Sequence, residues 1–142
     1  MLTRKSGWEG LLSQYIQDNL DRRQEWGQAD CSMFVCDWVL QVTGADPAKD
    51  FRGKYKTKAG AARAIKKFAG DLDGVAERIA GRLGMEETVP LKARRGDVVM
   101  VKGNGGNALG IIDMSGMAVA VQGKDGLEFV PAVHALKAWR VG

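Results

Sequence analysis

The stretch that most constrains the fold is residues 30–43, which predicts a capped, apolar helix with a cysteine in its first turn. Asp30 is a good N-cap residue, because its carboxylate can accept the free backbone N–H groups of the first helical turn. Apolar residues recur at helical spacing, at positions 34, 35, 38, 39 and 42, which predicts one face packed in a core. Gly44 supplies the left-handed cap that ends such a helix. The segment therefore predicts a core helix that presents Cys31 at its N-terminal end.

Two interpretations of Cys31 follow from this position. Free N–H groups and the dipole at a helix start stabilise a thiolate and lower the thiol pKa, which favours a nucleophile. A cysteine in an apolar helix is also commonly a small buried hydrophobic residue, and we adopt that interpretation for Cys36. Side chains five positions apart on one helix diverge, so we expect no disulfide between the two. Cys31 is therefore the candidate nucleophile.

Length and composition predict one ordinary globular domain over residues 1–142, with 45% hydrophobic and 27% charged residues. The first twelve residues lack the apolar segment of a signal peptide, and no stretch is long enough to span a membrane. We therefore expect a host-cytoplasmic location or export by a route that the sequence does not encode. His134 is the single histidine and no zinc-ligand spacing occurs, so we expect no metal and no cofactor.

Positive charge is concentrated between residues 49 and 67, in a chain with a net charge of +4. The basic residues there are Lys49, Arg52, Lys54, Lys56, Lys58, Arg63, Lys66 and Lys67. Such a patch could bind an anionic polymer or an acidic protein, with Lys54, Lys56 and Lys58 as candidate contacts. The simpler interpretation is a solvated helix face with its flanking loop. Tyr55 is the one aromatic residue among the lysines of 54–58, so nucleic-acid binding is not expected.

The order of the predicted elements indicates an α+β fold. Helical periodicity predicts helices at 8–21, 30–43, 57–69 and 72–83, with Ser6 and Thr57 capping the first and third. Short apolar runs between tight turns predict strands at 98–101, 109–112, 117–121, 127–130 and 138–141, with a glycine-rich loop at 103–107. We therefore predict N-terminal helices packed on a small C-terminal antiparallel sheet of about five strands.

Three motifs resemble those of the NlpC-type cell-wall peptidases, which belong to the papain-like cysteine peptidase superfamily. Asp30-Cys31-Ser32-Met33-Phe34-Val35 resembles their nucleophile motif, Asp-Cys-Ser-Gly followed by an aromatic or aliphatic residue and Val. Arg95-Gly96-Asp97-Val98-Val99 resembles their Gly-Asp-Leu-Val strand entry, and Leu109-Gly110-Ile111-Ile112 followed by Gly116 resembles their His-Val-Gly-Ile strand. The motifs occur in the family's order over residues 26–125. The resemblance implies a papain-like, NlpC-like fold with Cys31 as nucleophile.

Other features look more like one group within that superfamily. The short length, the Trp26-Gly27 lead-in and the closing Ala138-Trp139-Arg140-Val141 resemble a set of small phage proteins that are commonly encoded among tail genes. This resemblance implies other phage tail proteins as partners and the virion as a location. It implies peptidoglycan as the substrate of an active member.

The chain departs from the family at the catalytic base. The family's histidine falls at Ala108, preceded by Asn107, and neither side chain is a base at neutral pH. Gln122 is the candidate for the polar residue that orients the histidine, and His134 is the candidate for a relocated base. Two interpretations stay open: a structural or assembly component of a phage tail tip with a degenerate triad, or an active hydrolase that cleaves peptidoglycan stem-peptide amides through Cys31.

Overall fold

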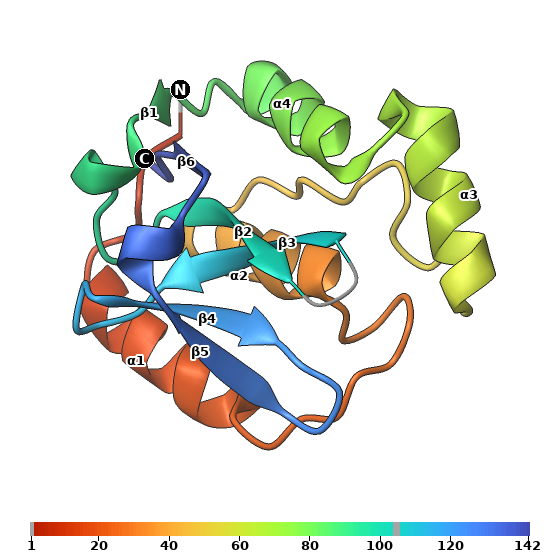
Figure 1. The fold of residues 1–142 in the computed structure, drawn as a ribbon. Helices are drawn as coiled ribbons and strands as arrows, with labels where there is room; N and C mark the ends of the chain where they lie inside the picture. Colours follow the sequence, from red (N-terminus) through yellow and green to blue (C-terminus); the bar gives the residue numbers. More distant parts are fainter. Residues whose placement is uncertain (1, 104–105) are drawn as a thin grey trace.

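The computed structural model describes residues 2–103 and 106–142, in which helices come first and an antiparallel sheet follows (Figure 1). The helices are α1 (Trp8–Asn19), α2 (Cys31–Thr43), α3 (Lys58–Ala69) and α4 (Leu72–Leu83). The strands are β1 (Glu87–Thr88), β2 (Val98–Gly103), β3 (Gly106–Ile112), β4 (Ala118–Gln122), β5 (Leu127–Pro131) and β6 (Lys137–Trp139). Two short 3₁₀ helices are η1 (Pro90–Lys92) and η2 (Ala132–His134). The predicted α+β class is confirmed.

The strands form one antiparallel sheet in the order β1-β6-β2-β3-β4-β5 among the described residues. The last strand, β6, lies between β1 and β2, with Trp139 opposite Glu87 on one side and opposite Val98 on the other. The prediction of about five strands missed β1, because two residues are too short to show a periodicity and form a strand only through pairing with β6. Asn104 and Gly105 of the predicted glycine-rich loop lie outside the described residues.

Helix α2 packs on one face of this sheet, and strict alternation along β3 divides its residues between the two faces. Leu109 and Ile111 join the core that surrounds Trp38 of α2. Ala108 and Ile112 belong to a second apolar cluster on the opposite face. Successive side chains of a strand point to opposite faces, so the residue at position 108 points away from α2. Each fully buried aliphatic side chain in such a core contributes roughly 1.5–3 kcal/mol.

The predicted caps of α2 and α3 are confirmed, and the predicted cap of α1 is wrong. The Asp30 carboxylate accepts the N–H of Met33 at 2.8 Å, and Thr57 caps α3 in the same way. The N-cap of α1 is Gly7 rather than Ser6, in a left-handed conformation (φ 76°) without a side-chain cap. The Lys5 N–H donates a hydrogen bond to the Val42 carbonyl oxygen near the end of α2 (2.8 Å). A tertiary contact therefore holds the segment that leads into α1.

A buried carboxylate holds the two ends of the described chain together. Asp97 is fully buried, and its Oδ1 accepts hydrogen bonds from the Arg4 guanidinium (2.8 Å) and the Val141 N–H (3.1 Å). Its Oδ2 accepts the N–H of Arg94 at 2.8 Å. Asp97 therefore fixes the entry into β2 rather than taking part in a site. Among the described residues, no helix combines the length and apolar character needed to cross a membrane.

Candidate thiol site

Cys31 is the first residue of α2, and it lies where this helix meets β3. The residue is partly exposed, and the backbone of Leu109 on β3 is near enough to influence the pKa of its thiol. Ser32, which follows it, is buried. The predicted position of Cys31 at the start of a capped core helix is confirmed, and this helix contacts β3.

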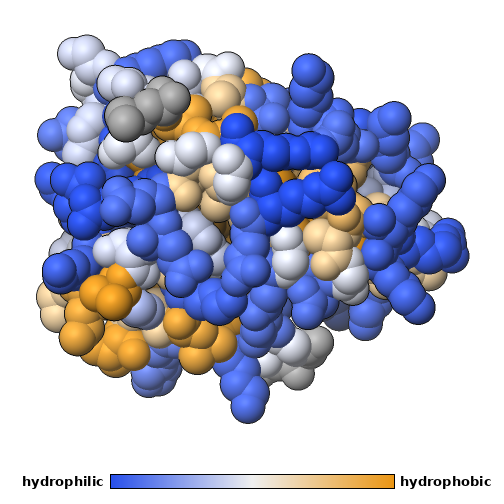
Figure 2. All heavy atoms as spheres, turned by 90° about the horizontal axis from the view of Figure 1, so that it is seen from above, coloured by the Kyte–Doolittle hydropathy of each residue, from blue (hydrophilic) through white to orange (hydrophobic). Residues whose placement is uncertain are grey.

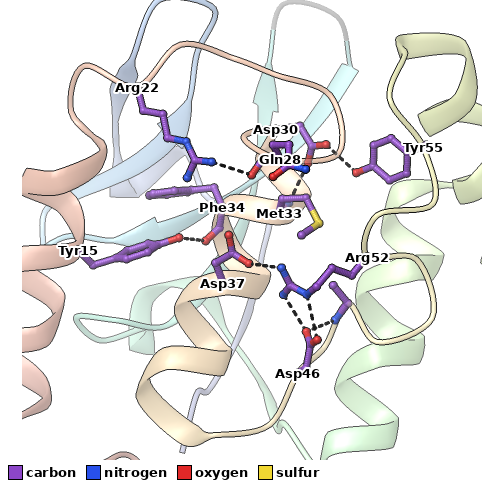
Figure 3. Close-up of polar contacts among 11 residues, drawn as sticks. Tyr15, Arg22, Gln28, Asp30, Met33, Phe34, Asp37, Asp46, Arg52 and Tyr55 are labelled. Carbon is purple, nitrogen blue, oxygen red and sulfur yellow. Dashed lines mark hydrogen bonds and ion pairs between the residues drawn. The ribbon is translucent and has the colours of Figure 1, made fainter.

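The turn before Cys31 is fixed by the buried carboxylate of Asp30 (Figure 3). Its Oδ2 accepts hydrogen bonds from the Gly27 N–H (2.9 Å) and the Tyr55 hydroxyl (2.6 Å), while Oδ1 caps the helix. Gly27 has a left-handed φ of 84°, and a Cβ there would lie 2.1 Å from the Tyr55 carbonyl oxygen. Only glycine fits this approach, so two loops close tightly around the start of α2.

The environment of Cys31 does not favour a thiolate. Burial raises the pKa of the Cys31 thiol, and the adjacent Asp30 carboxylate adds to this effect. Hydrogen bonds from the Leu109 backbone and from Ser32 lower the pKa, but burial dominates. The prediction of a lowered pKa is therefore wrong in direction, because it counted the helix dipole and could not count desolvation.

Two further contacts hold α2 against its neighbours (Figure 3). Arg52 joins Asp37 of α2 (2.6 Å) to Asp46 (2.9 Å), and the Tyr15 hydroxyl donates to the Phe34 carbonyl (2.7 Å). Arg52 is therefore neutralised by two carboxylates, and it does not add a free positive charge to the basic stretch of residues 49–67.

Cys36 is buried and lines an apolar cavity of about 40 Å³ between α2, α4 and the sheet. Such a cavity has room for a few water molecules. Burial is the largest cause that raises the pKa of the Cys36 thiol, with the neighbouring Asp37 carboxylate second. The interpretation of Cys36 as a core residue agrees with this placement.

The structure does not bring His134 to Cys31. His134 is exposed at the end of η2, and its neighbours Ala132 and Ala135 pack on the apolar cluster of the sheet face opposite α2. Figure 1 likewise shows the 3₁₀ turn before β6 in front of the sheet and α2 behind it. Because the chain has one histidine, no imidazole accompanies the thiol.

Gln122 lies at the end of β4 and is buried, with its amide donating to the carbonyl oxygens of Arg22 (2.8 Å) and Gly123 (2.9 Å). It therefore attaches the α1–α2 connection to the β4–β5 turn. Asn107 precedes Ala108 and lies on the α2 side of the sheet by strand alternation. Its amide donates to Asp73 of α4 at 3.1 Å, so this position is occupied by a contact between α4 and β3.

Lys54, Lys56 and Lys58 are all exposed. Lys54 lines an open hollow, which it shares with Arg63, Lys67 and Arg78. Sequence reasoning missed Arg78, because it belongs to α4 and only the packing of α4 against α3 brings it to the other cations.

The architecture and the helix-start cysteine define an NlpC/p60-like α+β fold. A solved structure of the NlpC/p60 domain of the peptidoglycan hydrolase SagA superposes with a TM-score of 0.54 over 93% of this chain and 97% of that domain, at 15% identity. At this identity the likeness shows the fold alone. The chain belongs to the family described as Domain of unknown function (DUF6950), whose sequence profile matches residues 3–141. A comparison with curated proteins gave no match.

Proposed function

We propose that this chain is an NlpC/p60-like domain without hydrolytic activity, which serves as a structural or assembly component of a phage tail tip. The observation that carries the proposal is the isolation of Cys31. Burial raises the pKa of its thiol, and the single histidine follows η2 residues that pack on the opposite face of the sheet. A cysteine hydrolase needs a base within hydrogen-bond reach to remove the thiol proton and later to protonate the leaving amine.

An exposed apolar surface supports the assembly role. Val89, Leu91, Met117, Val133 and Leu136 are 52–90% exposed, and we call them the η surface. They are neighbours, because η1 contacts η2 and the Ala132 N–H bonds to the Met117 carbonyl at 2.8 Å. Figure 2 shows hydrophobic side chains gathered at the lower left of an otherwise largely hydrophilic face, on the side of η1 and η2. Contiguous patches of this kind commonly mark protein–protein contacts.

The rival function is an active peptidoglycan hydrolase. The position of Cys31 at a helix start beside β3 favours it, and the NlpC/p60 fold makes peptidoglycan its natural substrate class. To decide, purified chain is incubated with peptidoglycan and release of new amino groups is measured for wild type, Cys31→Ala and His134→Ala, with Cys36→Ala as the matched cysteine control. We expect no release above the Cys31→Ala background. Release that needs Cys31 and survives Cys36→Ala would refute the proposal.

The assembly role has its own test, in purified tails of a phage that encodes the chain. We expect the protein in the particles, with cross-links between the η surface and a second tail protein. Leu91→Ser with Val133→Ser should lower incorporation. Phe129→Ser should leave incorporation unchanged. Phe129 is also exposed, but it pairs with Ala120, which packs on the α2 face of the sheet, so Phe129 lies on the face away from the η surface. Absence from the particles, or equal loss with both variants, would contradict the role.

A further inference from the structure

A basic hollow lies between α3, α4 and the segment before Tyr55. It encloses about 650 Å³ of open space. Lys54, Arg63, Lys67 and Arg78 line it, and Phe51 and Phe68 provide apolar wall. The four cations come from three separate segments, so the tertiary structure rather than a run of sequence makes the cluster. We call these four residues the basic hollow.

The positive charge of the basic hollow is not neutralised by acidic residues of its own wall. Asp50 is the acidic residue of its wall, and its carboxylate is paired with Arg82. Helix α3 contains no acidic residue at all. In the described part of the chain, Lys54, Arg63 and Lys67 have no ion pair within 4 Å. Cations gathered in a concave surface raise the local potential and attract anions.

Arg78 is held in place by two contacts. Its guanidinium lies 4.5 Å above the Phe68 ring and donates to the Phe68 carbonyl oxygen. Arg82 lies over the same ring at 5.2 Å, and Phe51 packs against it edge-on at 5.8 Å. The partly buried Phe68 ring therefore already contacts three protein side chains. Because these contacts compete with stacking on Phe68, we expect the hollow to recognise charge rather than stacked bases.

We propose that the basic hollow binds the phosphodiester groups of a wall polymer of the poly(glycerol phosphate) type. Such a polymer is flexible, carries one negative charge per repeat and needs no aromatic platform. Four cations within one hollow allow successive phosphates to be contacted together. The inference does not depend on Cys31 or on the η surface, so its failure would leave the proposed function untouched.

The test measures binding of a labelled poly(glycerol phosphate) oligomer by fluorescence anisotropy at 50 and 200 mM salt. If all four cations contact phosphates, Kd should rise about 50-fold between the two salt concentrations, using a slope of about 0.7 per contact as for single-stranded polymers. Arg63→Gln with Lys67→Gln should weaken binding at 50 mM salt and reduce the rise to about 7-fold. These two residues are exposed on α3 and glutamine is a good helix former, so the fold should be retained.

The matched control is Lys92→Gln with Lys124→Gln, which removes the same charge from exposed sites outside the hollow. It should keep most of the wild-type affinity and salt dependence. Equal loss in both double variants would mean unspecific charge attraction and would overturn the site. Tighter binding of a single-stranded DNA oligomer of equal charge would overturn the choice of polymer. Binding of inorganic phosphate alone, or no binding, would overturn the proposal as well.

Discussion

Tyr55→Phe tests whether the buried Asp30 carboxylate fixes the start of α2. The substitution keeps the ring and removes one hydrogen bond of 2.6 Å to Asp30 Oδ2. Asp30 retains the N–H groups of Gly27 and Met33, so the carboxylate stays partly satisfied. Hydrogen bonds to charged groups contribute about 1.5–3 kcal/mol, so we expect this loss in the free energy of unfolding.

Tyr15→Phe is the matched control, because it also removes a tyrosine hydroxyl that bonds to the α2 segment. Its partner is the neutral carbonyl of Phe34 at 2.7 Å, where we expect a loss of about 0.5–1.5 kcal/mol. Urea unfolding followed by circular dichroism gives the free energy of unfolding of both variants, which can be compared when their m-values are equal. Tyr55→Phe should also speed alkylation of Cys31, because the turn that covers the thiol loosens. Equal destabilisation by both variants, or a larger effect of Tyr15→Phe, would show that the buried carboxylate is not the anchor.

Three further predictions follow from single contacts. Gly27→Ala should unfold or strongly destabilise the chain, because the added Cβ would overlap the Tyr55 carbonyl oxygen. Gly53 is the matched control, because its φ of 73° is similar but the space around it is open. Gly53→Ala should lower the free energy of unfolding by about 1 kcal/mol, measured by thermal unfolding. Asp97→Ala should cost about 3–5 kcal/mol in urea unfolding, since it leaves the Arg4 guanidinium without its buried partner; a loss below 1 kcal/mol would contradict this. Alkylation of Cys31 should stay slow at neutral pH and rise only at alkaline pH, because burial raises the pKa of its thiol above the ordinary thiol range. With a raised folded-state pKa, the unfolded chain loses this proton first, so the free energy of unfolding should fall as pH rises from the ordinary thiol pKa of the unfolded chain toward the raised pKa of the folded chain. An alkylation rate that is already maximal at pH 7 would reverse this conclusion.

Local sequence patterns predicted the helices, because capping and apolar spacing act within a few residues. The α2 boundaries were given by Asp30 at its start and by Gly44 at its end. Capping of α1 failed where a tertiary contact intervened, since the Lys5 backbone is tied to the end of α2. Strand β1 was missed for a related reason, because it exists only through its pairing with β6.

The candidate site shows the same division. The sequence by itself determined that Cys31 begins a capped core helix and that one histidine is available to it. The tertiary structure alone decided that His134 lies across the sheet and that burial of the thiol opposes its ionisation. It also decided which cations meet, by packing α4 against α3 so that Arg78 faces Lys54 and its neighbours. Caps and periodicity are local properties of the chain, whereas desolvation and the grouping of charges depend on segments that only folding brings together.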